Sequence, residues 1–157
     1  MSKQFGGVEV LSNVDVDIHA GEIHALLGEN GAGKSTFAKI LAGVHRPTTG
    51  TLRLSGEPVE ITSPIAAQKL GVALIHQEPI SFPDLSVAEN IVMGREVGGL
   101  LSRVPWAQII ADARRYMDML GVSIDVQRPM RGLSIANQQM VEIARALASD
   151  SRLIIMD

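Results

Sequence analysis

The stretch that decides the fold of this chain reads Gly28-Glu29-Asn30-Gly31-Ala32-Gly33-Lys34-Ser35-Thr36. It matches the pattern G-x-x-x-x-G-K-[ST], in which a glycine-rich loop cradles phosphate groups. Glycines allow the backbone to curl, so that successive N–H groups can point at one anion. The pattern places Lys34 for the β- and γ-phosphates of a nucleotide and the Ser35 hydroxyl for Mg²⁺. All nine residues are candidate nucleotide-binding residues, and an incidental glycine-rich turn is the weaker alternative.

Both flanks of this loop suit the pattern. Residues 22–27, Glu-Ile-His-Ala-Leu-Leu, predict a buried strand before the loop. Residues 35–41 predict a helix with an apolar stripe, and Gly43 predicts its end. A helix that begins near Lys34 adds the positive end of its dipole to the phosphate site.

Composition bounds the class of protein. The 157 residues suit one domain, and 46 % apolar with 3 % aromatic residues predict an aliphatic core. The net charge of −3 provides no general basic field for nucleic acid, and the absence of cysteine excludes disulfides and Cys-based zinc sites. The four histidines lack metal-ligand spacing and predict structural or surface roles. No signal peptide or membrane span is predicted, so we expect a cytoplasmic protein whose membrane role comes through a partner.

The rest of the pattern predicts an α/β fold with a helical insertion. Strands are predicted over residues 10–18, 51–54, 59–61, 72–75 and 153–156. Helices are predicted over residues 63–70, 86–93, 105–120 and from 134 onward, with a loop over 94–104. The last helix is expected to bury one face, formed by Ala136, Met140, Ile143, Ala144 and Leu147.

Three further residues are candidates because of where they stand. Asp157 ends a strand, where a carboxylate can help to hold Mg²⁺; a residue capping a turn is the alternative. Gln77 follows the strand 72–75, where an amide can ligate Mg²⁺ or orient an attacking water; a polar loop residue is the alternative. Ser134 precedes a long helix and can complete a second anion site; an ordinary N-cap is the alternative.

The order and spacing of these residues resemble the nucleotide-binding domain of ABC transporters over essentially the whole chain. Gln77 lies 43 positions after Lys34, Ser134 lies 57 after Gln77, and Asp157 lies 23 after Ser134. In that family Gln77 matches the Q-loop, residues 133–137 match the signature sequence, and residues 153–157 match the Walker B motif.

The resemblance extends to one aromatic residue and to one group within the family. Phe5, 29 positions before Lys34, matches the residue that stacks on adenine, and a core phenylalanine is the alternative. The first ATPase half of bacterial importers for simple sugars, such as ribose, galactose and xylose, is similar over residues 21–31, 76–79, 85–91 and 138–147. Where the general signature ends in Gly-Gly-Gln, this chain has Ile135, Ala136 and Asn137, which limits close backbone approach to a phosphate.

This resemblance implies a P-loop nucleoside triphosphate hydrolase fold with a parallel core sheet, an antiparallel β edge and an inserted helical subdomain. Residues 1–78 and 132–157 are expected to form the ATP-binding core, and residues 79–131 the helical subdomain. The implied cofactors are ATP and Mg²⁺, with Lys34, Gln77 and Asp157 as catalytic residues and Ser35, Gln77 and Asp157 as metal ligands. The family's catalytic glutamate and γ-phosphate histidine fall beyond Asp157, so we expect this chain alone to bind nucleotide with little turnover.

The resemblance also implies a peripheral ATP-binding subunit on the cytoplasmic face of the plasma membrane, powering uptake of a simple sugar. The implied partners are a second ATPase half, membrane-spanning permease subunits and, indirectly, a periplasmic or extracellular sugar-binding protein, with no nucleic acid. Two alternatives stay open. One is a catalytically incomplete nucleotide-binding fragment, and the other is an ABC-type ATPase that transports nothing.

Overall fold

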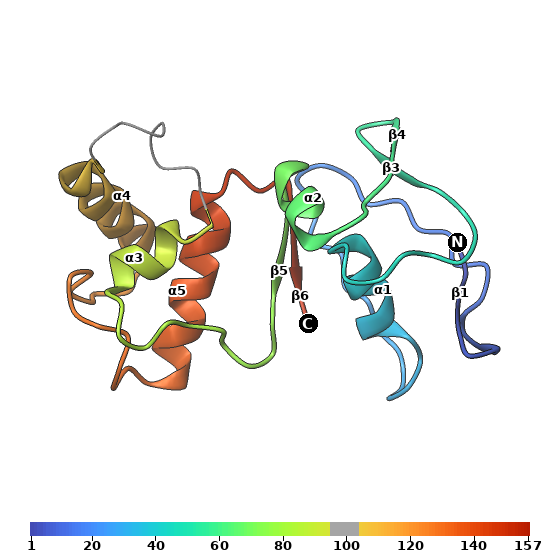
Figure 1. The fold of residues 1–157 in the computed structure, drawn as a ribbon, viewed down its shortest axis with the longest axis horizontal. Helices are drawn as coiled ribbons and strands as arrows, with labels where there is room; N and C mark the ends of the chain where they lie inside the picture. The colour runs from blue at the N-terminus through green and yellow to red at the C-terminus, as the bar shows by residue number, and fades with distance from the viewer. Residues whose placement is uncertain (95–103) are drawn as a thin grey trace. The chain divides into compact units, whose positions relative to one another are not determined.

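The computed structural model describes residues 1–94 and 104–157, which divide into the units Met1–Val72 and Ala73–Asp157 (Figure 1). The predicted loop over 94–104 lies almost wholly outside the described residues. The elements are β1 (Lys3–Phe5), β2 (Val8–Leu11), α1 (Lys34–Leu41), β3 (Leu52–Leu54), β4 (Glu57–Val59), α2 (Pro64–Lys69), β5 (Val72–Ile75), α3 (Val87–Val92), α4 (Trp106–Met119), α5 (Ile135–Ala148) and β6 (Leu153–Met156).

Two antiparallel hairpins supply the strands of the first unit up to β4. β1 and β2 are joined by two glycines, and β3 and β4 are joined by Ser55 and Gly56, whose φ angles are 53° and 83°. A two-residue turn with both φ angles positive sets the register of the strands that it joins. The register pairs Leu52 with Val59, so β4 begins at Glu57 and the prediction of a strand over 59–61 is displaced by two residues.

The prediction of a buried strand over residues 22–27 is wrong for this structure. The segment belongs to no strand, and the side chains of Ile23 and Leu27 are 102 % and 89 % exposed. The strand predicted through Ile18 also ends early, at Leu11. A strand needs neighbours that accept and donate its backbone hydrogen bonds. Within the described residues no strand pairs with either segment, which therefore remains extended and exposed.

The predicted helices of the first unit are confirmed. α1 begins after Gly33 and is followed by Gly43, whose φ of 74° is the left-handed conformation common after a helix end. α2 begins at Pro64, and the Ser63 hydroxyl caps it by accepting a hydrogen bond from the Ala66 N–H at 3.2 Å. Both ends follow local residue chemistry, which explains why the sequence could predict them.

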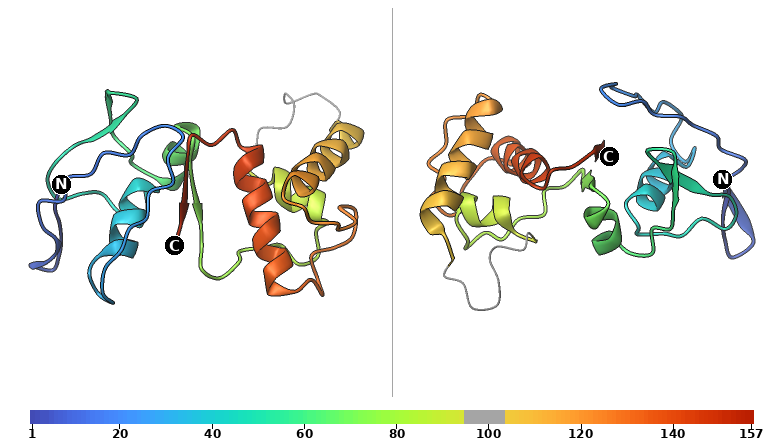
Figure 2. Two further views of the ribbon diagram at one scale, coloured as in Figure 1. Left: turned by 180° about the vertical axis from the view of Figure 1, so that it is seen from behind. Right: turned by 90° about the horizontal axis from the view of Figure 1, so that it is seen from above.

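An apolar core lies among α3, α4 and α5 in the second unit (Figure 2). Its fully buried members are mostly aliphatic, as the composition predicts: Val87, Ala88, Ile91, Ala113, Met117, Val126, Met130, Val141, Ala144 and Ala148. The face predicted for α5 is only partly correct, because Ala136 is exposed and Val141 is buried. The core contacts α5 from Met140 onward, and Ile135 and Ala136 in the first turn of that helix are exposed.

β5 and β6 lie side by side and run in the same direction (Figures 1 and 2). Together with the hairpins, this pair agrees with an α/β fold that has parallel and antiparallel strands. The first three residues of β6 are half-buried, and the fourth, Met156, is 69 % exposed. The predicted burial of this strand is therefore incomplete. The pair has no third strand among the described residues, which leaves both edges uncovered. Within residues 1–94 and 104–157, no helix is long and apolar enough to cross a bilayer.

Candidate nucleotide-binding site

The phosphate loop turns directly into α1. Gly31 and Gly33 have φ angles of 86° and 90°, a region that residues with a Cβ rarely adopt. At Gly33 a Cβ would also lie 2.6 Å from Cδ2 of Leu11 and 2.8 Å from the carbonyl oxygen of Val10. Both conformation and close packing on β2 therefore require glycine at this position.

Lys34 is the first residue of α1 and reaches back over the loop. Its Nζ donates hydrogen bonds to the carbonyl oxygens of Gly28 and Glu29, each at 2.8 Å. A phosphate oxygen carries charge and accepts a stronger hydrogen bond than a neutral carbonyl. The ammonium is thus held at the loop by acceptors that an anion can replace. Ser35 and Thr36 follow in the first turn of the helix, with Ser35 exposed.

Phe5 lies at the end of β1 and is 41 % exposed, so the alternative of a core phenylalanine is wrong for this structure. Its ring packs edge to face against His45, with ring centroids 5.1 Å apart and planes at 75°. The Lys3 Nζ lies 4.7 Å from the centroid of the Phe5 ring. Sequence analysis missed His45, because its contact with Phe5 joins residues that are far apart in the sequence.

Gln77 and Asp157 come together at one end of the β5–β6 pair. The backbone N–H of Asp157 donates to the carbonyl oxygen of Ile75, the last residue of β5, at 3.2 Å. Gln77 follows Ile75 by two residues, and both Gln77 and Asp157 are exposed. The carboxyl ends of parallel strands are where ligands bind in open α/β sheets. The predicted metal ligands of the second unit therefore share one sheet edge.

Ser134 acts as the N-cap of α5. Its hydroxyl oxygen accepts a hydrogen bond from the Asn137 N–H at 3.2 Å, and the residue is exposed. This is the geometry that the N-cap alternative describes. A second anion site at Ser134 stays a prediction, since a hydroxyl that accepts one bond can still donate another.

Among the described residues, the carboxylates of Glu22 and Glu89 have pKa values below the ordinary value of 4.5. A hydrogen bond from His24 lowers the pKa of Glu22, which lies before the phosphate loop. Hydrogen bonds from the side chain and then the backbone of Ser86 lower the pKa of Glu89 in α3. Neither carboxylate is among the predicted site residues.

The sequence profile of the ABC transporter family matches residues 11–157. The chain is 52 % identical over 157 residues to the ribose import ATP-binding protein RbsA 2 of Streptomyces avermitilis. It is 48 % identical over the same length to the ribose import ATP-binding protein RbsA of Rhodococcus jostii. Each match covers 100 % of this chain and 31 % of the relative, so these relatives carry much further sequence.

The fold is similar to that of solved ATPase subunits. The structure of cbiO1 from Clostridium perfringens, part of the ABC transporter complex cbiONQ, aligns with a TM-score of 0.80 at 24 % identity. The alignment covers 99 % of this chain and 62 % of that one. At this identity the likeness establishes the fold alone, and together with the family profile it confirms the predicted P-loop α/β class.

Proposed function

This chain belongs to the ABC transporter family, and on that premise we propose that it is the ATP-binding part of an importer that uses ATP hydrolysis to take up a simple sugar. The observation that carries the proposal is the phosphate loop. Lys34 Nζ lies 2.8 Å from two loop carbonyls at the start of α1, so one cation and a row of helix N–H groups converge there. Relatives named as ribose importers support the sugar class.

The residues of the loop have the donors and the charge needed to bind a nucleoside triphosphate. Residues 28–36 supply backbone N–H donors and Lys34 supplies the charge that opposes the phosphates. Phe5 offers a partly exposed ring on which a base can stack. When bound, ATP would supply a phosphoanhydride whose hydrolysis can drive transport.

Mg²⁺ fits the donor set that the sequence predicts for it. Ser35, Gln77 and Asp157 offer one hydroxyl, one amide oxygen and one carboxylate, which are oxygen ligands of the kind that Mg²⁺ takes in small number. Gln77 and Asp157 lie at one edge of β5–β6, which supports a shared role for them. Gln77 is also the residue that we expect to orient the attacking water.

We assign the remaining roles by family membership. Ser134 and the start of α5 are expected to face the nucleotide of a second ATPase half. Permease subunits would hold the protein at the cytoplasmic face of the membrane, and a sugar-binding protein outside would deliver the solute. Residues 1–78 with 132–157 would form the ATP-binding core, and residues 79–131 the helical subdomain.

Calorimetric titration of MgATP tests the phosphate site. Loss of a charge-assisted hydrogen bond is worth about 1.5–3 kcal/mol, so Lys34→Ala is expected to weaken binding by roughly 10- to 100-fold. Lys39→Ala, on the same helix but in its last turn, is the matched control and should bind as the parent does. If Lys34→Ala and the parent titrate alike, the loop is not the site.

Sugar uptake tests the transport role separately. With Lys34→Ala in the chromosomal gene, accumulation of labelled ribose, galactose and xylose should be measured beside a gene deletion. The variant should fall to the deletion level for at least one sugar. If the variant loses MgATP binding but uptake of all three sugars is unchanged, the phosphate site is supported and the role in sugar uptake is contradicted.

Pairing with a second ATPase half is tested by crosslinking. A photoreactive group at Ser134 should reach the phosphate loop of a partner only when ATP is present. A crosslink that forms equally without ATP, or never reaches that loop, contradicts the assignment of Ser134.

A further inference from the structure

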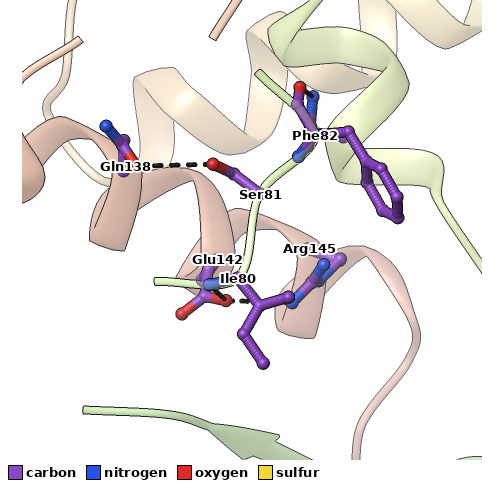
Figure 3. A network of polar contacts seen from close by, with 7 residues as sticks. Ile80, Ser81, Phe82, Gln138, Glu142 and Arg145 are labelled. Atoms are coloured by element: carbon purple, nitrogen blue, oxygen red, sulfur yellow. Dashed lines mark hydrogen bonds and ion pairs between the residues drawn. The ribbon is translucent and has the colours of Figure 1, made fainter. Parts of the chain in front are cut away.

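Three residues that follow the Gln77 segment, Ile80-Ser81-Phe82, are held by side chains of two helices (Figure 3). We name these three residues the strap. The Ile80 N–H donates to Oε1 of Glu142 at 2.8 Å, and the Ser81 hydroxyl donates to Oε1 of Gln138 at 3.3 Å. Both acceptors belong to α5, the helix that Ser134 caps.

The third strap residue is held from α3. Asn90, only 2 % exposed, accepts a hydrogen bond from the Phe82 N–H at 2.8 Å and donates one to the Phe82 carbonyl at 3.1 Å. The side chains of Ile80 and Phe82 are 55 % and 47 % exposed. Apolar burial therefore contributes little to the position of the strap, and these polar contacts define it.

Glu142 is an unusual residue for its position. It is 3 % exposed and follows Val141 on the core side of α5. Its Oε1 also accepts from Arg145 Nη2 at 3.1 Å, while Oε2 is buried without a hydrogen-bond partner in the described part of the chain. A buried carboxylate with an unpaired oxygen costs free energy, and an apolar side chain there would avoid that cost. Stability alone does not explain a glutamate here.

We propose that Glu142, assisted by Gln138 and Asn90, is a positioning residue that fixes the strap and so sets where Gln77 stands. Gln77 precedes Ile80 by three residues, and between them lies Pro79, whose ring restricts the backbone. The contact also links the Gln77 segment to α5, so that the two are held as one piece. This inference rests on the proposed role of Gln77 toward Mg²⁺, and Glu142 would act only through the position of Gln77.

Two measurements on the 157-residue chain test the inference. The first is the exchange rate of the Ile80 amide by NMR, which reports the clamp itself. The second is the ratio of ATP dissociation constants without and with Mg²⁺ by calorimetry, which reports Gln77. Met117→Ala is the control, because Met117 is 1 % exposed in the core of this unit and belongs to α4, which supplies none of the strap contacts described above. Gln77→Ala gives the reference for a lost Gln77.

Glu142→Ala is expected to speed exchange of the Ile80 amide about tenfold or more beyond the effect of Met117→Ala. It should lower the Mg²⁺ ratio toward that of Gln77→Ala. Glu142→Gln keeps an oxygen that can accept from the Ile80 N–H, so it should retain most of both signals. If Glu142→Ala does not fold, Gln138→Ala loosens the same strap at Ser81 and should lower the Mg²⁺ ratio in the same direction.

Effects of Glu142→Ala no larger than those of Met117→Ala would overturn the inference. So would faster exchange with an unchanged Mg²⁺ ratio, provided that Gln77→Ala lowers the ratio. If Gln77→Ala itself leaves the ratio unchanged, the proposed Mg²⁺ role of Gln77 is wrong and the positioning of Gln77 for Mg²⁺ falls with it. The exchange rates then decide whether Glu142 holds the strap.

Discussion

Two isoleucines show how differently the two units are built. Ile91 in α3 of the second unit is 1 % exposed, whereas Ile23, before the phosphate loop of the first unit, is 102 % exposed. Helices satisfy their own backbone hydrogen bonds and need only bury one face, which α3, α4 and α5 do against one another. A strand depends on neighbouring strands for its hydrogen bonds. An apolar segment without such neighbours stays in solvent even when its sequence is typical of a buried strand.

The largest effect is expected when isoleucine is replaced by alanine in each of the two units, which tests this contrast directly. Ile91→Ala should lower the free energy of unfolding by about 2–5 kcal/mol, because it leaves a cavity in the core. Ile23→Ala should change it by no more than about 0.5 kcal/mol. Urea unfolding followed by the fluorescence of Trp106, the single tryptophan, measures both. Equal losses would mean that residues 22–27 are buried in solution.

The next effect concerns Phe5, whose partly exposed ring we propose as a stacking surface for the base. Phe5→Ala should weaken ATP by about 1–3 kcal/mol, the usual range for stacking on a base, and should leave inorganic triphosphate unaffected. Competition titrations with both ligands measure the difference. The same loss for both ligands would make Phe5 a structural residue that supports β1.

A smaller effect comes from the capping box of α3. The Glu89 pKa lies below 4.5 because Ser86 hydrogen-bonds its ionised form. The carboxylate therefore stabilises the folded state above the unfolded-state pKa, and this contribution is lost as the pH falls through the folded-state pKa. Glu89→Gln should cost about 0.3–1 kcal/mol at pH 7, and its difference from the parent should shrink as the pH falls below 4.5 and vanish below the folded-state pKa. If Glu89→Gln is still less stable than the parent in acid, the loss does not come from the charge and must come from altered packing.

The smallest effect is expected at Glu22, although its pKa is lowered in the same direction. The partner is His24 in the exposed segment, and Glu22 itself lies at the surface, so solvent screens the interaction. Glu22→Gln should leave the urea midpoint unchanged at pH 7 and in acid. If the urea midpoint of Glu22→Gln falls as far as that of Glu89→Gln, the segment 22–27 makes stabilising contacts in solution that the structure does not show.

The sequence predicted well the features that depend on residues close together in the chain, and it predicted poorly those that depend on distant residues. The phosphate loop, the caps at Ser63, Ser86 and Ser134, and the helix stops at glycine all depend on residues within a few positions of each other. The helix starts predicted near residues 63, 86 and 134 and the helix end predicted at Gly43 are found in the structure. The strand over residues 22–27 and the strand through Ile18 depend on distant partners, and both predictions failed. The strap contacts, which join residues up to 62 positions apart, left no local pattern to recognise.

The sequence by itself predicted where a phosphate would bind, because glycines at 31 and 33 and a lysine at 34 define such a loop through local backbone conformation and charge. It also determined the family, since the order of the motifs can be read along the chain. Only the tertiary structure decided that Phe5 is exposed beside His45, that Asp157 and Gln77 share one sheet edge, and that Glu142 is buried against the strap. These facts arise from contacts between residues far apart in the chain, and folding alone brings such residues together.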